Sequence, residues 1–319
     1  MSVTENNKTK LLAVVGPTAS GKTALAVELA LRYGGEIISC DSVQVYKGLD
    51  IGSAKVTAEE ARGVRHHLID AVSPCDDFSC AEYSELAGEA IKDIVSRGRL
   101  PVFCGGTGLY LNTVLRGSAL SEAGKDDEYR QALTEKYTPA ELHGMLGEID
   151  PESAAAIHEN NVKRVVRALE IYHVTGMTKT HWDELSRKEA EPFDSVVIGL
   201  DYRSRDTLYR RIDQRVDIML SAGLESEVAA LDSPGFRAST ASQGIGYKEL
   251  LAYRDGRYTL PEAVEAIKKG SRNYAKRQLT WFRRDPRVQW IYPDDAGDGD
   301  ALSFVTERAQ KIIKDAWGI

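Results

Sequence analysis

The sequence predicts an α/β fold in which a parallel β-sheet with crossover helices is interrupted by an all-helical subdomain. Two observations predict it. Short apolar runs alternate with amphipathic stretches over the first hundred residues, and such runs disappear between about residues 117 and 185. With 319 residues, the chain is long enough for one large or two small domains and for a sizeable buried core.

Strands are expected at the apolar runs 11–15, 36–40 and 101–106. Between them, residues 24–33 and 81–98 carry apolar side chains at helical spacing. Because strands that alternate with helices usually pair in parallel, these segments predict one part of a sheet with helices packed on its faces.

Helix start signals follow one another closely in the segment that lacks apolar runs. Thr138 begins a capping box, and Asp150 precedes a proline that suits the first turn of a helix. We therefore expect residues 117–185 to form a helical insertion domain, while residues 1–116 and 186–319 form the α/β core with a basic helical C-terminal part.

After the insertion, strands are expected at 195–200 and 288–292, and helices at 208–231 and from 261 to about 284. In the last helix, an apolar stripe is expected to face the core, formed by Val264, Ile267, Tyr274 and Phe282.

The composition is that of an ordinary globular protein, with 42% hydrophobic and 28% charged residues. No apolar run approaches the roughly 20 residues that a membrane span needs, and the first ten residues are polar. We therefore expect no membrane partner and a cytoplasmic location. The four cysteines form no CxxC pair, so the sequence predicts neither a zinc ribbon nor a disulfide framework.

Charge is unevenly distributed along the chain. The net charge is −7, from 41 Lys and Arg against 48 Asp and Glu, yet residues 268–287 hold eight Lys or Arg and one Asp. A charged helical face is usually a solvated surface, whereas a basic density this high inside an acidic chain favours a nucleic-acid contact.

The clearest chemical signal is the run GPTASGKT at residues 16–23, which matches G-x-x-x-x-G-K-[ST] and lies between an expected strand and an expected helix. Backbone N–H groups of such a loop bind anionic oxygens, Lys22 can reach terminal phosphates, and the Thr23 hydroxyl can hold Mg²⁺. The core is therefore expected to be P-loop NTPase-like, with Mg²⁺ as cofactor. The other interpretation is a glycine-rich turn without a ligand. The candidate phosphate-binding residues are Gly16, Pro17, Thr18, Ala19, Ser20, Gly21, Lys22 and Thr23.

Two further turns follow expected strands. Asp41 comes directly after 36–40, at the carboxyl end of a strand, where parallel sheets bind ligands. It could ligate magnesium, accept a proton or be a solvated turn residue. The turn Gly105-Gly106-Thr107-Gly108 follows 101–106 and becomes informative only as a third element on the same rim.

Together, these motifs resemble the tRNA dimethylallyltransferase family, which prenylates an adenosine beside the anticodon. The matching segments span nearly the whole chain: GPTASGKT (16–23), DSVQVYKGLDIGSAK (41–55), HHLID (66–70), FSCAEY (78–83), GGTGLYL (105–111), KRVVRALEIY (163–172), QGIGYKEL (243–250) and YAKRQLTWFRR (274–284). Val43, Ser53 and Val56 depart from the usual Met, Thr and Pro, and remove no polar group thought to act in catalysis. The sequence ends without the Cys/His finger of eukaryotic members, so we expect a bacterial type.

The resemblance implies that the loop binds the pyrophosphate part of dimethylallyl diphosphate, and that the acceptor is N6 of the adenosine at tRNA position 37. It implies that Asp41 is the general base or hydrogen-bond acceptor for N6. Thr107 and Arg130 match positions that contact the reacting nucleotide, and Arg215 matches one that helps to hold the diphosphate.

The implied partner is tRNA, bound through its anticodon stem-loop with the target base extruded from its stack. The helical insertion and the basic helix would supply contacts to the RNA backbone. We expect a monomer. The implied RNA-binding residues are Asp41, Ser42, Val43, Gln44, Lys163, Arg164, Val165, Val166, Arg167, Gln243, Gly244, Ile245, Gly246, Tyr247, Lys248, Lys269, Arg272 and Lys276.

Three other functions are weighed against this one. An adenylate isopentenyltransferase shares the loop and the acid but accepts a free nucleotide, so it needs neither the insertion nor the basic helix. A small-molecule kinase or NTPase would turn over ATP, and a pure nucleic-acid binding module would not need the phosphate loop.

Adjacent His66 and His67 are expected to point to opposite faces of a strand, which does not favour a metal site. Trp281 and Trp290 are expected to pack rather than to stack on bases.

Overall fold

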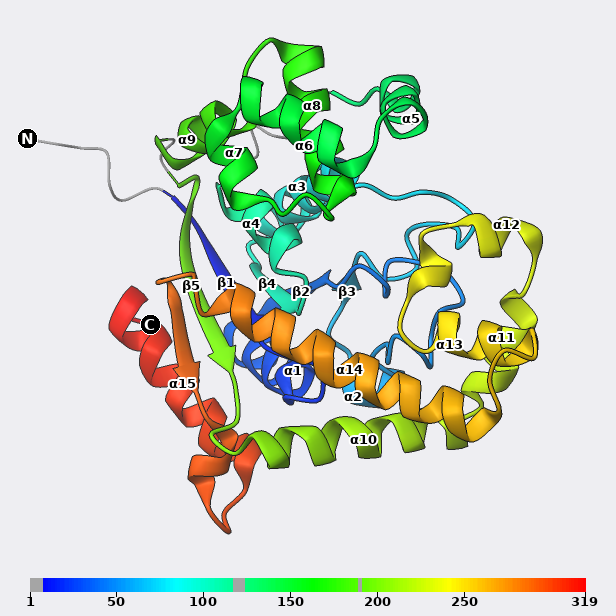
Figure 1. Cartoon of the computed structure of the whole chain (residues 1–319). Coiled ribbons are helices and arrows are strands. Elements are labelled where there is room, and N and C mark those ends of the chain that lie inside the picture. Colours follow the sequence, from blue (N-terminus) through cyan, green and yellow to red (C-terminus); the bar gives the residue numbers. More distant parts are fainter. Residues whose placement is uncertain (1–7, 117–123, 189–190) are drawn as a thin grey trace, which may run out of the picture. The chain divides into compact units, whose positions relative to one another are not determined.

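The computed structural model describes residues 8–116, 124–188 and 191–319, and it divides into two compact units (Figure 1). Met1–Asn112 and Phe193–Ile319 form an α/β unit, and Thr113–Pro192 form a helical unit. The boundaries lie a few residues outside the expected 117 and 185. The reason is that α4 (Gly108–Arg116) crosses the first boundary and β5 begins only at Phe193. Residues 117–123, the first part of the expected insertion, lie outside the described residues.

A six-stranded parallel sheet is the centre of the α/β unit. Its strands, in the order β3-β2-β4-β1-β5-β6, are β3 His66–His67, β2 Gly35–Cys40, β4 Leu100–Gly105, β1 Thr9–Val15, β5 Phe193–Leu200 and β6 Val288–Ile291. The five strands expected from apolar runs are all present, and every pairing is parallel. The predicted α/β class with a parallel sheet is therefore confirmed.

Helices cover the sheet and extend one side of the unit. They are α1 Lys22–Tyr33, α2 Ala58–Ala61, α3 Cys80–Ser96, α10 Arg205–Ser221, α11 Leu224–Leu231, α12 Pro234–Ala238, α13 Tyr247–Arg254, α14 Leu260–Phe282 and α15 Ala301–Trp317. The single helix expected at 208–231 is interrupted at Gly223, whose φ of 100° is left-handed and ends α10 before α11 begins. Helix α15 was not predicted from the sequence.

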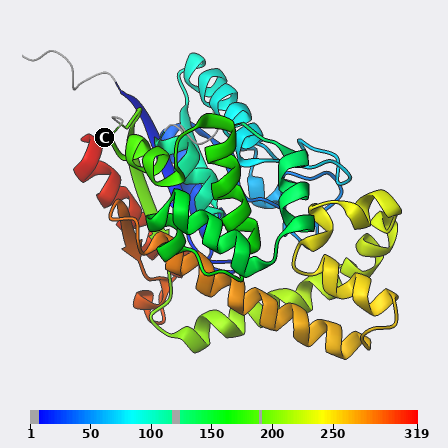
Figure 2. The same cartoon turned by 45° about the horizontal axis from the view of Figure 1, so that its top comes forward.

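The core explains why the strands are continuous apolar runs. Residues 11–15 of β1 are at most 1% exposed, because helices pack on both faces of a parallel sheet. Helices α1 and α15 bury apolar side chains against β1, β4 and β5. A second cluster joins α10, α11, α13 and α14, and Figure 2 shows α14 running alongside α10. None of the helices in the described part of the chain is long and apolar enough to cross a membrane.

The helical unit has its own small core. Its helices are α5 Asp127–Lys136, α6 Pro139–Ile149, α7 Pro151–Ala156, α8 Val162–Thr175 and α9 Lys179–Lys188. Thr138 and Glu141 form the expected capping box, and the Asp150 side chain caps α7. Leu142, Leu146 and Leu169 are at most 1% exposed in a cluster that joins α5, α6 and α8.

A buried carboxylate holds the edge of the sheet together. Glu36 at the start of β2 is 4% exposed, accepts hydrogen bonds from Arg97 at the end of α3, and lies 2.7 Å from His67 Nε2 on the edge strand. The Arg97 hydrogen bonds lower the pKa of Glu36 to about 2, against the opposing effect of burial. Glu36 therefore ties β2, β3 and α3 to one another.

Replacing Glu36 should make stability depend less on pH. Because the folded pKa of Glu36 is about 2 and its usual value is 4.5, its contribution is fully present above the usual value and is lost as the pH falls toward 2. We expect Glu36→Gln to lower the free energy of unfolding by about 2 to 3 kcal/mol at neutral pH. Urea unfolding from pH 7 to pH 3 measures this. A wild-type advantage that stays constant over that range would contradict the assignment.

Candidate active site

The phosphate-loop motif forms a tight turn between β1 and α1. Gly16 has a φ of 153°, Gly21 a φ of 90°, and Ala19 adopts a left-handed φ of 62°. A Cβ at Gly16 would approach the Leu200 carbonyl oxygen to 2.6 Å, so only glycine fits beside the end of β5. The motif therefore lies at the carboxyl edge of the sheet, where its backbone can surround a ligand.

Polar groups around this loop make few hydrogen bonds within the described part of the chain. The buried Ser20 hydroxyl oxygen and the Nε atom of Arg215 accept or donate no hydrogen bond there. Lys22 makes one long hydrogen bond, 3.4 Å from Nζ to the Pro17 carbonyl. Burial lowers the pKa of Lys22 and that of Arg215, and the nearby Asp41 carboxylate opposes both shifts. Such donors fit an anionic ligand.

Asp41 follows β2 and closes a turn through one of its two carboxylate oxygens. Oδ1 accepts hydrogen bonds from the backbone N–H groups of Val43, at 2.9 Å, and Gln44, at 3.4 Å. Among the described residues, Oδ2 has no hydrogen-bond partner. The turn is held by Thr107, whose hydroxyl oxygen accepts a hydrogen bond from the Ser42 N–H at 3.1 Å. The structure thus brings Asp41 and Thr107 together beside the loop.

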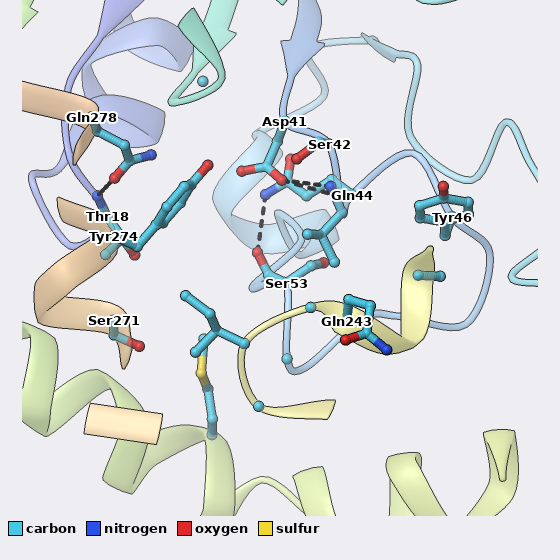
Figure 3. Close-up of a pocket in the computed structure, with 18 of the residues that line it drawn as sticks. Thr18, Asp41, Ser42, Gln44, Tyr46, Ser53, Gln243, Ser271, Tyr274 and Gln278 are labelled. Carbon is cyan, nitrogen blue, oxygen red and sulfur yellow. Dashed lines mark hydrogen bonds between the residues drawn. The ribbon is translucent and has the colours of Figure 1, made fainter. Parts of the chain in front are cut away.

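The Gln44 side chain stabilises this turn through hydrogen bonds. Its amide oxygen accepts a hydrogen bond from Ser39, and its amide nitrogen donates to the carbonyls of Ser53 and Ala54, each at 3.2 Å. Both functions of the amide are therefore engaged with the protein itself, and Figure 3 shows the hydrogen bond to Ser53.

Tyr274 lines the site, although its place in the apolar stripe suggested core packing. Figure 3 shows it projecting from α14 with its hydroxyl turned toward Asp41. Burial raises the pKa of Tyr274, the negative charge of Asp41 adds to the rise, and a hydrogen bond with Thr107 opposes it. The available signal was the spacing of Ile267, Ser271, Tyr274 and Gln278, which places two polar residues on the same helical face.

Asp41, Lys22, Arg215, Gln44 and Tyr274 all line one cavity of about 380 Å³ within the α/β unit. Its apolar lining residues are Val43, Ile212, Val216, Met219, Ile245 and Ile267, and polar residues such as Gln243 and Ser271 also line it. This lining suits a ligand that combines negative charge with a hydrocarbon group.

Glu227 on α11 holds residues 50–52, in the segment that follows Asp41. The sequence analysis did not predict this role. Its carboxylate accepts hydrogen bonds from the N–H groups of Asp50, Ile51 and Gly52, at 3.0, 2.7 and 3.1 Å. It also accepts one from the Tyr247 hydroxyl at 2.7 Å. Tyr247 and the segment 50–52 are thus fixed by one side chain.

Some residues of the expected RNA-binding runs are buried, which corrects the prediction for them. Tyr247 is 0% exposed in the core around α13, and Gly246 beside it is also buried. Val165 and Val166 are 0% and 4% exposed in the core of the helical unit. These three side chains have no surface to offer an RNA, because a helix must bury one face to be stable.

The other residues of these runs keep some exposure. Gln243 and Lys248 are exposed, and Gly244 and Ile245 are half-buried beside the cavity. Lys269 and Lys276 are exposed on α14. Arg272 is half-buried, and its guanidinium lies 2.5 Å from Asp213 on α10, so this residue also holds two helices together.

In the helical unit, Lys163 and Arg164 are exposed on α8. Arg130 and Arg167 both pair with the fully buried Glu170 carboxylate, at 2.7 and 2.5 Å. Each arginine side chain remains about one third exposed, at 35% and 33%. The contact of Arg130 with the reacting nucleotide stays a prediction.

The histidine pair has structural partners. His66 Nδ1 lies 2.9 Å from the Val64 carbonyl, and His67 faces Glu36. Within the described ranges, no group of three or more His, Cys, Asp or Glu side chains could hold a metal ion.

Comparison with known proteins identifies the family of the chain. Residues 44–285 match the family model described as IPP transferase. The chain belongs to this family. A tRNA dimethylallyltransferase from Anoxybacillus flavithermus is 52% identical over 282 residues, covering 88% of this chain and 90% of its own length. One from Geobacillus thermodenitrificans is 49% identical and covers 95% and 96%. The chain is therefore a prenyl transferase of the IPP transferase family.

Solved structures of IPP transferase relatives share the fold. A tRNA isopentenylpyrophosphate transferase from Bacillus halodurans is 45% identical, with a TM-score of 0.72 and coverage of 97% of this chain and 98% of that one. A eukaryotic dimethylallyltransferase acting on tRNA is 28% identical, with a TM-score of 0.81 and coverage of 96% and 80%.

Removing the carboxylate of Glu227 should loosen the segment that follows Asp41. Glu227→Gln leaves a neutral amide that cannot accept all four hydrogen bonds, so we expect the free energy of unfolding to fall by about 1 to 3 kcal/mol. Hydrogen exchange should become faster at residues 50–52. The exposed Glu225 on the same helix provides the matched control, Glu225→Gln, which should change neither quantity. Equal exchange rates in both variants would refute the role of Glu227.

Proposed function

We propose that this protein transfers a dimethylallyl group from dimethylallyl diphosphate to N6 of the adenosine at tRNA position 37, which lies 3′ to the anticodon. The observation that carries the proposal is the cavity itself. It is lined by Lys22 and Arg215, by apolar side chains, and by Asp41, whose Oδ1 alone accepts hydrogen bonds among the described residues. The names of the relatives, tRNA dimethylallyltransferase, agree with such a site.

The donor is proposed to lie with its diphosphate in the loop. Lys22, Arg215 and the Ser20 hydroxyl would bind the phosphate oxygens, and Val216, Met219 and Ile267 would contact the hydrocarbon. In the reaction, the bond between the allylic carbon and the diphosphate oxygen breaks, and inorganic pyrophosphate leaves with the bonding electrons. Positive groups fixed around the loop stabilise that developing charge without reorganising.

Magnesium is proposed as the cofactor on the chemistry of the donor set. The Thr23 hydroxyl and the Asp41 carboxylate both line the cavity, and Mg²⁺ prefers oxygen ligands of this kind. The ion commonly takes further ligands from substrate phosphates and water. Bound there through Thr23, it would supply additional positive charge against the diphosphate.

The acceptor is proposed to enter beside Asp41. As the new bond between N6 and the allylic carbon forms, N6 must lose a proton, and Asp41 Oδ2 is proposed to accept it or to hold the N–H group. The second oxygen, Oδ1, is engaged with the backbone, so the carboxylate keeps a fixed direction. Thr107 and Tyr274 define the remaining sides of this position.

The RNA is proposed to bind through exposed basic side chains. Lys163 and Arg164 on the helical unit, with Lys269 and Lys276 on α14, can contact phosphates, which gives affinity without base specificity. Such contacts would compensate for unstacking the target base. An adenylate isopentenyltransferase is not favoured, because a free nucleotide requires neither surface. The monomeric state and the cytoplasmic location stay predictions of the sequence.

A choice of acceptors tests the function directly. The full chain is incubated with labelled dimethylallyl diphosphate and Mg²⁺, together with unmodified tRNA, AMP or no acceptor. We expect the label to enter tRNA alone. Labelled AMP would indicate the adenylate enzyme instead, and ATP hydrolysis without prenyl transfer would indicate a kinase or NTPase.

Asp41→Asn should slow prenyl transfer by about two to four orders of magnitude, because the amide cannot accept the N6 proton. The affinity for tRNA should change little, since the Asn oxygen can still cap the turn at residues 43 and 44. Single-turnover rates and filter binding separate the two quantities. The exposed Asp76 gives the control variant, Asp76→Asn. An Asp41→Asn rate within threefold of the wild type would exclude Asp41 as the base.

A further inference from the structure

A buried amide on α14 joins the phosphate loop to a second turn of the site. Gln278 is 4% exposed. Its Oε1 accepts a hydrogen bond from the Thr18 N–H at 3.0 Å, and its Nε2 donates one to the Gly106 carbonyl at 3.1 Å (Figure 3 shows the Thr18 bond). The orientation of the amide follows from its partners, because one is a donor and the other an acceptor.

The glycines of the turn after β4 are explained by this helix. A Cβ at Gly106 would lie 1.9 Å from Gln278 Nε2, and one at Gly108 would lie 2.0 Å from Cδ1 of Trp281. Neither glycine has a positive φ, so conformational freedom does not explain them. Helix α14 packs closely against this turn through Gln278 and Trp281, which lie one helical turn apart.

The same helix carries part of the cavity wall. Ile267, Ser271 and Tyr274 precede Gln278 on the face of α14 that lines the cavity. A shift of the Gln278 amide would therefore move Tyr274 relative to Asp41, and a shift of the phosphate loop would pull on the amide through Thr18. All of these residues belong to the α/β unit.

We infer that Gln278 is a positioning residue through which the phosphate loop and α14 adopt their active arrangement together. Its two hydrogen bonds go to backbone groups of the two turns, so the role assigned to it is to position those turns. The inference rests on the proposed function in one respect, which is that the loop binds a diphosphate. By linkage, a diphosphate that stabilises the loop also stabilises α14, and the reverse holds equally.

Gln278→Met in the full chain tests the connection. Methionine keeps the length and approximate volume of the side chain but cannot replace either hydrogen bond. Gln289→Met is the matched control, because Gln289 is exposed on β6. Binding of inorganic pyrophosphate with Mg²⁺ is measured by calorimetry, and hydrogen exchange is compared with and without pyrophosphate.

In the wild type and in the Gln289→Met control, pyrophosphate should slow exchange both at the loop, residues 16–23, and on α14, residues 270–282. In Gln278→Met, pyrophosphate should bind roughly tenfold more weakly. At saturating pyrophosphate, it should slow exchange at the loop but no longer on α14. A merely structural role would raise exchange on α14 equally with and without the ligand.

If saturating pyrophosphate slows hydrogen exchange on α14 in Gln278→Met as much as in the wild type, the inference is overturned and the proposed function is left intact. A wild-type chain that fails to bind pyrophosphate would overturn both the inference and the proposed function.

If Gln278→Met is unstable, Gly106→Ala and the double variant Gly106→Ala/Gln278→Ala provide the test. Removing the amide should restore the melting temperature lost in Gly106→Ala, because it makes room for the methyl group, but should not restore pyrophosphate affinity. The inference would be contradicted if the double variant recovered both the melting temperature and the pyrophosphate affinity, or neither of them.

Discussion

One row of the parallel sheet determines where the site can lie. Val15 of β1 and Cys40 of β2 both pair with Gly105 of β4, so three strands end level with one another. The segments that leave them, the phosphate loop, the Asp41 turn and the turn at Gly106, therefore emerge side by side. Gly105 makes this row possible, because a Cβ there would lie 2.0 Å from the Cys40 carbonyl oxygen. The phosphate loop, Asp41 and Thr107 are placed by this row.

The pairing joins distant residues, but each strand and the turn that follows it are marked locally in the sequence, and so much of the fold could be predicted. Each strand is an apolar run followed at once by its turn, so strand order was not needed to expect Asp41 and Thr107 on the same rim as the loop. The break at Gly223 and helix α15 were missed for different reasons. Gly223 interrupts a stretch that is otherwise helical. Helix α15 does carry signals, the Asp300 cap and apolar residues every four positions from Val305 to Trp317, and these were overlooked.

The rest of the site depends on contacts between distant parts of the chain. Glu227 binds the backbone of residues 50–52, and Gln278 binds that of Thr18, so neither leaves a local pattern. Tyr274 was placed in the core because helical periodicity distinguishes inward from outward faces, and a cavity wall is also an inward face. For the same reason, Val165 and Tyr247 were included among surface residues: a motif that contains binding residues also contains the core residues that support them.

The balance of charge in the cavity favours an anionic ligand. Burial lowers the pKa of Lys22 and of Arg215, and the charge of Arg215 lowers that of Lys22 further, so holding both cations here costs stability that Asp41 only partly offsets. A ligand with concentrated negative charge relieves this cost and so stabilises the fold by binding it. Anionic oxygens can pair with Lys22 and Arg215, and a hydrocarbon group can contact Val216, Met219 and Ile267, which line the same cavity. A diphosphate ester of a short hydrocarbon combines the two groups, in agreement with the proposed donor.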